Sequence, residues 1–146
     1  MQSQIPKKEV VNPSALGWVI SAALLLFLGD RLIKRLAATI ISDQGGFFYF
    51  SYYANTGGVF NLPWPLPILI CFAGVALVAV SWLGWRAYQK NNRLAFLAAW
   101  LMFVGGYSNL LDRLSVGAVI DVWHLSNLSF NLADIYLLLG LGLMVL

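Results

Sequence analysis

No charged side chain interrupts residues 66–85, which read LPILICFAGVALVAVSWLGW. An α-helix needs about 20 mostly apolar residues to cross roughly 30 Å of hydrocarbon. This run therefore predicts a transmembrane helix, and the chain enters it through a stiff proline-rich corner at residues 63–67.

The composition of the whole chain points the same way. Hydrophobic residues make up 60% of the 146 residues and charged residues 10%, against about 45–50% and about 25% in soluble domains. A soluble domain this small needs many polar groups to cover its surface. This composition excludes a soluble domain, a disordered segment and a nucleic-acid binder, despite the net charge of +3. The one cysteine, Cys71, excludes a disulfide framework and a cysteine-based zinc site.

Three more apolar runs accompany the first. They lie at about residues 10–33, 94–111 and 131–146, so we expect an all-α integral membrane protein with four transmembrane helices in one domain, residues 1–146. The N-terminal run is too long for the apolar part of a signal peptide and no small-residue cleavage site follows it, which favours a retained helix. The last run is short for a span, which suggests a trimmed C-terminus.

Positive residues in short loops predict the orientation. Lys7 and Lys8 precede the first run, and the loop between the second and third runs holds Arg86, Lys90 and Arg93. Both segments are therefore expected in the cytoplasm, together with both termini. The bias is modest, because the other two connections hold four basic residues. Those connections also hold all five aspartates, at positions 30, 43, 112, 121 and 134.

The outer connection at about residues 35–62 is too polar to span the membrane and too long for a turn. Residues 47–53 read FFYFSYY and are rich in strand-forming aromatics, and a turn follows at residues 55–58. This pattern predicts a small extracytoplasmic β-rich segment. A belt of aromatic side chains at the lipid headgroups is the simpler interpretation, and both can hold at once.

Polar residues at helical spacing mark the outer ends of the runs. The spaced sets are Asp30 with Lys34; Asn109 with Asp112 and Arg113; and Asn131 with Asp134. Asp121 stands apart in the apolar sequence VIDVW, with no cation near it. Ionisable residues near a membrane are functional candidates by default.

Each of these residues also has a plain structural explanation. Ion pairing accounts for the first set and for the acid–arginine pair of the second, and the two asparagines can join helices by hydrogen bonds. Asp134 can stabilise a helix N-terminus. The structural explanations are weakest for Asp121 and Asp134, and two neighbouring carboxylates on one side suit general acid and base catalysis.

Five blocks of sequence, in order, resemble the lipoprotein signal peptidases, the signal peptidase II family. The blocks are Asp30 with Lys34; residues 53–60, YANTGGVF; residues 109–113, NLLDR; residues 119–121, VID; and residues 130–134, FNLAD. The chain departs from the family pattern in several places. The third block is preceded by Ser108 where glycine is usual, and the fourth continues with Val122 where phenylalanine is usual.

The resemblance implies an intramembrane aspartic endopeptidase with Asp121 and Asp134 as its catalytic pair. Its substrate would be a prolipoprotein cut before a diacylglyceryl-modified cysteine, at the outer side of the bacterial inner membrane. Substrate-binding or supporting residues would be Asn55, Gly57, Asn109, Arg113 and Asn131, and structural support would come from Asp30, Lys34 and Asp112. We expect no cofactor and no metal, membrane lipids as the other partners, and a monomer.

Other functions stay open at this point. A serine hydrolase would use His124 with Ser115, Ser126 or Ser129, but no nucleophile-elbow pattern accompanies these serines. His124 beside a tryptophan is expected at the membrane interface, and Cys71 is expected to serve packing. A transporter subunit, an assembly factor, or a family member with a special substrate are the remaining alternatives. Arg113 is expected to pair with a carboxylate or with substrate oxygen atoms.

Overall fold

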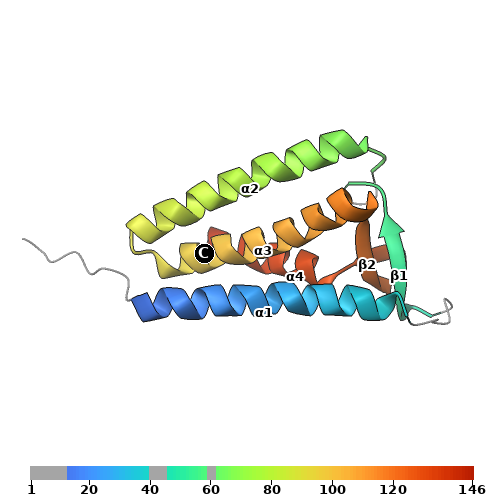
Figure 1. The fold of residues 1–146 in the computed structure, drawn as a ribbon, viewed down its shortest axis with the longest axis horizontal. Coiled ribbons are helices and arrows are strands. Elements are labelled where there is room, and N and C mark those ends of the chain that lie inside the picture. Colours follow the sequence, from blue (N-terminus) through green and yellow to red (C-terminus); the bar gives the residue numbers. More distant parts are fainter. Residues whose placement is uncertain (1–12, 40–45, 59–61) are drawn as a thin grey trace, which may run out of the picture.

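The computed structural model describes residues 13–39, 46–58 and 62–146. In these ranges, helices lie where the four apolar runs predict them: α1 (Pro13–Ala37), α2 (Leu66–Gln89), α3 (Arg93–Val116) and α4 (Leu132–Val145). The helices form an elongated bundle whose one end is covered by strands (Figure 1). The first three residues of the predicted first span, 10–12, lie outside the described residues.

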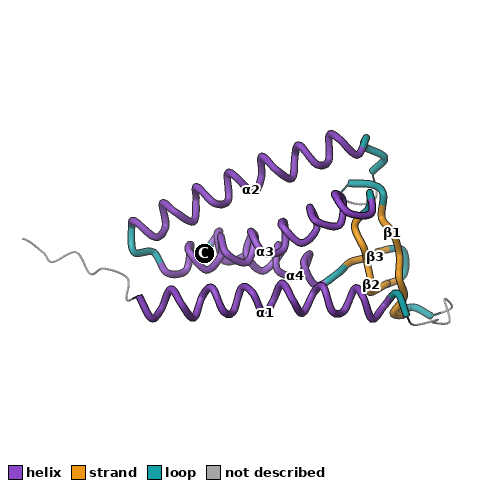
Figure 2. The backbone as a smooth tube through the Cα atoms, viewed as in Figure 1, coloured by secondary structure: helices purple, strands orange, loops and turns teal. Residues whose placement is uncertain are grey.

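The strands form one small antiparallel sheet. It contains β1 (Phe48–Asn55), β2 (Val119–Leu125) and β3 (Leu128–Phe130), in the order β1-β2-β3. Figure 2 shows the sheet across the end of the bundle where α1 finishes and α4 begins. The prediction of a strand in the aromatic segment is confirmed by β1, although residues 40–45 and 59–61 of that connection lie outside the described part of the chain.

The prediction of β structure was incomplete, because it covered only the connection between the first and second helices. The connection between α3 and α4 also contains strands, and β2 lies at the centre of the sheet. Helix α3 also continues to Val116, past its predicted end at 111, and stops at Gly117, whose φ of 78° favours glycine. A turn in which Ser126 has a φ of 54° then joins β2 to β3. A short strand covered by neighbours lacks the strict alternation by which strands are recognised in sequence.

Small residues let the helices approach closely. A Cβ atom added at Gly105 would collide with the carbonyl oxygen of Ala133, and one at Gly140 would lie 2.7 Å from the carbonyl oxygen of Ala98. Helices α3 and α4 therefore touch backbone to backbone, as is common between helices in membranes. This contact fixes the first turn of α4 against the outer half of α3.

Replacing Gly140 by alanine should consequently weaken the α3–α4 contact. We expect a loss of about 1–3 kcal/mol in the free energy of unfolding, because backbone atoms cannot move away as a flexible side chain can. Unfolding of the detergent-solubilised protein by heat or SDS measures it. Gly142→Ala is the matched control on the same helix, since nothing lies within 4 Å of its added Cβ. Equal stability of the two variants would contradict the close contact.

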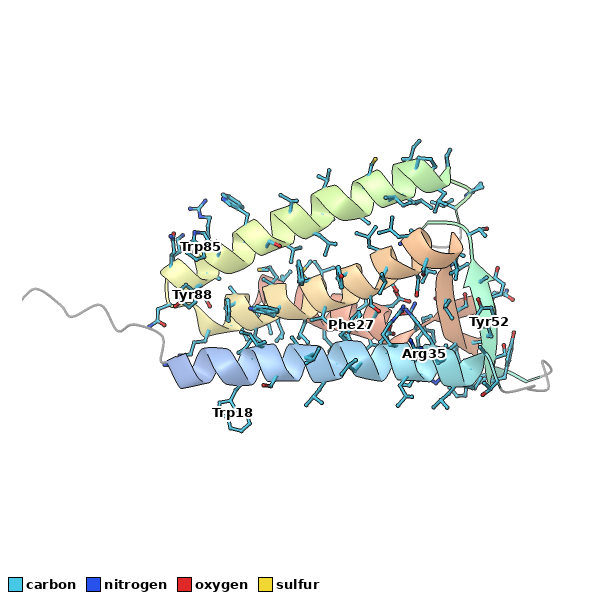
Figure 3. The ribbon with its side chains drawn as sticks, viewed as in Figure 1. Trp18, Phe27, Arg35, Tyr52, Trp85 and Tyr88 are labelled. Carbon is cyan, nitrogen blue, oxygen red and sulfur yellow. The ribbon has the colours of Figure 1, made fainter. Side chains whose placement is uncertain are left out.

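The outer faces of the helices are apolar. Helices α2 and α3, of 24 residues each, are long and apolar enough to cross a membrane, and α4 is a shorter apolar helix of 14 residues. Trp18 projects away from the bundle, and Trp85 and Tyr88 lie at the end remote from Tyr52 of the sheet (Figure 3). Cys71 is also exposed on α2. Its side chain therefore does not pack inside the protein, contrary to the expected packing role.

Candidate active site

Buried polar side chains gather where the bundle meets the sheet. They come from α1, α3, β2 and the residue before α4, segments far apart in sequence, and comprise Asp30, Lys34, Ser108, Asn109, Asp112, Asp121 and Asn131. Buried charges are costly unless they are paired and hydrogen-bonded. The partners of each group therefore indicate what it does.

Three of these charged side chains and the partly exposed Arg31 neutralise one another. Asp112 accepts hydrogen bonds from Arg31 at 2.6 Å and from Lys34 at 2.8 Å. The same two cations lie 3.1 Å and 3.0 Å from Asp30. Two acids and two bases thus form a compact ion cluster between α1 and α3. The sequence had suggested Arg113, the neighbour of Asp112, as its partner, whereas Arg31 takes that place across the helix interface.

Asp30 also connects α1 to the other helices. Its Oδ2 atom accepts from the Ser108 hydroxyl at 2.6 Å, and its Oδ1 atom accepts from the backbone N–H of Ala133 at 3.1 Å. Ser108, which replaces the glycine usual in the resembled family, is fully buried. The roles of Arg31 and Ser108 were missed in the sequence, since neither fits a same-helix spacing pattern with its acid.

Asp121 lies on β2 and is 1% exposed. Its Oδ2 atom accepts hydrogen bonds from the Asn55 amide at 3.1 Å and the Ser129 hydroxyl at 2.9 Å, and its Oδ1 atom accepts from the Asn131 amide at 3.0 Å. On β1, the register shifts between Phe50 and Tyr53, immediately before Tyr53 pairs with Asp121. Such irregularities re-aim side chains and occur often beside active sites.

Asp134 lies in the first turn of α4. Its Oδ2 atom accepts from the backbone N–H of Asn131 at 3.0 Å, while the Asn131 side chain accepts from the backbone N–H of Asp134, a reciprocal capping box. Its Oδ1 atom accepts from the Asn109 amide at 2.8 Å. The helix start that the sequence predicted is thus built from a pair of candidate site residues.

Asn131 joins the two acids. Its amide nitrogen donates to Asp121 and its backbone nitrogen to Asp134. The same amide donates to Asn109 Oδ1 at 3.2 Å, which also accepts from Lys34 at 3.2 Å. A continuous hydrogen-bond network therefore runs from the ion cluster, through two asparagines, to both remaining aspartates.

The structure brings together almost all of the residues chosen from the sequence. Gly57 enters the network through its backbone N–H, which donates to Asn55 Oδ1 at 3.0 Å and so fixes the orientation of that amide. Arg113 is the exception. It is half-buried, and within the described ranges no carboxylate oxygen lies within 4.0 Å of its guanidinium. Its expected pairing with a protein carboxylate is therefore absent from this structure.

A serine–histidine site does not form. His124 is buried, stacks on Tyr49 at 4.5 Å between ring centroids, and places Nε2 3.3 Å from the carbonyl oxygen of Ser51. The hydroxyl of Ser129 donates to Asp121, and that of Ser115 to the carbonyl of Leu111. The expected place of His124 at the membrane interface stays a prediction, and within the sheet its ring packs against Tyr49 and Tyr53. No group of three metal-ligating side chains occurs in the part of the chain that was described.

A cavity of about 390 Å³ lies elsewhere, between α2 and α3. Aromatic rings dominate its walls, including Trp85, Tyr88 and Trp100, and none of the described aspartates lines it. It lies toward the end of the bundle remote from the sheet (Figure 3). The chemistry of the acids therefore does not take place there.

Comparison with solved structures identifies the fold. Two structures of bacterial membrane enzymes, determined by the in meso method at 2.3 Å and 1.9 Å resolution, have TM-scores of 0.74 and 0.73 to this chain. Each match covers 88% of this chain at 22% sequence identity. The matches cover 85% of the first solved chain and 90% of the second. The fold is thus that of a bacterial membrane enzyme.

Sequence comparison then gives the family. The model of the family described as signal peptidase (SPase) II matches residues 22–146. The lipoprotein signal peptidase of Chromobacterium violaceum is 32% identical over 91% of this chain and 93% of its own, and that of Streptococcus pneumoniae is 29% identical over 88% and 90%. The chain belongs to the signal peptidase II family and is a peptidase of a bacterial membrane. The resemblance noted in the sequence is confirmed.

Proposed function

We propose that this chain is an aspartic endopeptidase that removes signal peptides from lipid-modified prolipoproteins, with Asp121 and Asp134 as its catalytic pair. The substrate class is inferred from the relatives, which are lipoprotein signal peptidases. The observation that carries the catalytic assignment is the bridge through Asn131, which holds both carboxylates at one place.

The chemistry needs both acids. Two neighbouring carboxylates repel when both are ionised, so one keeps a proton. The ionised member takes a proton from a water molecule, and the oxygen of that water attacks the carbonyl carbon of the scissile peptide bond. The protonated member donates its proton to the carbonyl oxygen. As the C–N bond breaks, the leaving amine takes the proton that came from water, and the second acid recovers its own proton from a hydroxyl of the tetrahedral intermediate.

The ion cluster leaves these two acids for catalysis. Asp30 and Asp112 are matched in charge by Arg31 and Lys34, so their role is to fix α1 against α3 and α4. Arg113 remains available for the substrate. Its planar guanidinium can bind a peptide carbonyl or an ester oxygen of the lipid with two parallel hydrogen bonds. Asn55 and Gly57 support Asp121 from the side of β1.

We further propose that all four helices span the inner membrane, with the sheet and the site on the outer side. Helix α1 starts and α4 finishes at the same end of the bundle, remote from the sheet (Figure 1). The α2–α3 loop at that end is rich in basic residues, as cytoplasmic loops are. The monomeric state expected from the sequence stays a prediction.

Cysteine labelling tests this topology. In a Cys71→Ser background, Asn127→Cys in the β2–β3 turn should react with a membrane-impermeant maleimide added to intact spheroplasts, and Asn91→Cys in the α2–α3 loop should not. Both positions are exposed in the structure, so protein packing does not protect either. Asn91→Cys should react once the membrane is permeabilised. The reverse pattern would contradict the outer location of the site.

Cleavage of a purified precursor tests the activity. The detergent-solubilised protein should release the signal peptide from a diacylglyceryl-modified precursor and leave the unmodified precursor intact. Mass spectrometry of the products locates the cut, which should lie before the modified cysteine. An intact modified precursor would favour a transporter subunit, an assembly factor, or a member of the family with a special substrate.

A further inference from the structure

The hydrogen-bond partners of Asp121 differ in what they can do when its protonation changes. An ionised carboxylate only accepts hydrogen bonds, whereas a protonated one must also donate one. The three side chains bound to Asp121 are Asn55, Ser129 and Asn131. A catalytic acid that gains and loses a proton needs at least one partner able to accept.

The side-chain amides of the two asparagines cannot flip to present an acceptor to Asp121. The Oδ1 atom of Asn55 accepts from the backbone N–H of Gly57 at 3.0 Å, and the Oδ1 atom of Asn131 accepts from the backbone N–H of Asp134 at 3.0 Å. A backbone N–H can only donate, so turning either amide around would place two donors against each other. Each amide therefore keeps its NH₂ group toward Asp121.

Ser129 is different. Its hydroxyl can rotate to donate or to accept, and it lies 2.9 Å from Asp121 Oδ2. Within the described part of the chain it is the one side chain bound to Asp121 with this freedom. Ser129 lies two residues before Asn131 on an extended segment, so the two side chains project to the same side, toward Asp121.

We propose that Ser129 is a positioning residue that keeps Asp121 hydrogen-bonded in both of its protonation states. The hydroxyl donates while Asp121 is ionised and turns to accept when Asp121 carries a proton. The proton stays on the carboxyl group and the hydroxyl only rotates, so no further reactant is needed. This inference rests on the proposed catalytic pair and adds a residue that acts through its hydrogen bond to Asp121.

A pair of variants of equal shape tests the proposal. Threonine and valine differ by a hydroxyl in place of a methyl group, and both suit a strand. Ser129→Thr should keep kcat within about 3-fold of the wild type, while Ser129→Val should lower kcat by about 10- to 100-fold, the effect of losing one hydrogen bond to a charged group. The KM for the lipid-modified precursor should be similar in both variants, because the proposed role of Ser129 acts through Asp121.

Two controls separate this proposal from the proposed function. The wild type must cleave the precursor in the same assay, and Ser115→Ala, which removes a hydroxyl bonded to the Leu111 carbonyl, should leave kcat unchanged. Thermal unfolding of both Ser129 variants should be alike. Equal kcat values for the threonine and valine variants, in an assay where the wild type is active, would overturn the role of Ser129 and leave the catalytic pair standing.

Discussion

Replacing Asp112 by alanine should lower the free energy of unfolding by about 3–5 kcal/mol, the cost of leaving a buried charge uncompensated. Asp112 is fully buried and accepts from Arg31, Lys34 and the backbone N–H of Ile120. Without it, two cations face the single charge of Asp30. One positive charge is then left without an acidic partner, and the Lys34 side chain, at 2% exposure, is almost fully buried.

The measurement is SDS or thermal unfolding of the purified protein in one detergent. Arg35→Ala is the control, because Arg35 is a charged residue at the same end of α1 that is exposed rather than buried (Figure 3). It should change stability by less than about 0.5 kcal/mol. Asp112→Asn, which keeps the shape but not the charge, should fall between the two. A variant Asp112→Ala as stable as Arg35→Ala would show that the ion cluster does not hold the helices.

The helices were predictable from the sequence because crossing a membrane requires long apolar runs, and residues 66–85 satisfy that need without any charge. Strand β1 was predictable for a different reason, because its aromatic residues favour a strand and a turn follows at residues 55–58. The strand that carries Asp121 was not predictable in this way. Its residues are apolar on both sides, so they show no alternation, and their pairing with β1 depends on a contact between residues far apart in sequence.

The site was predictable as a set of residues but not as a set of bonds. Spacing along a helix pairs Asp30 with Lys34, which the structure contains. It cannot show that Arg31, one residue from Asp30, reaches Asp112 on another helix. Likewise Ser129 was considered as a nucleophile for His124, its partner in the strand pairing, whereas its hydroxyl binds Asp121. Contacts between elements decide these bonds, and one sequence does not contain them.

Asp121→Asn and Asp134→Asn should each lower the rate of cleavage by about 10³-fold or more, the range expected when a general acid or base is removed. Asparagine keeps the size of the side chain but cannot take a proton from water. Both variants should insert and fold, because a neutral amide is easier to bury than a charge. The double variant should be little slower than either single one, since two residues that act as a unit do not contribute additively.

Stability must be measured beside activity, because both acids also accept structural hydrogen bonds. Asp121 holds three side chains at the sheet, and Asp134 caps α4 through Asn131. Asp112→Asn is the matched comparison. It changes an aspartate of the same buried region outside the proposed pair, and the fraction of that variant that folds should retain cleavage.

The most direct test is single-turnover release of the signal peptide from a diacylglyceryl-modified precursor, with equal amounts of folded wild type, Asp121→Asn, Asp134→Asn and the double variant. The catalytic pair predicts release by the wild type, and rates near the uncatalysed background for all three variants. Cleavage by either single variant at a rate close to that of the wild type would show that Asp121 and Asp134 do not activate water together.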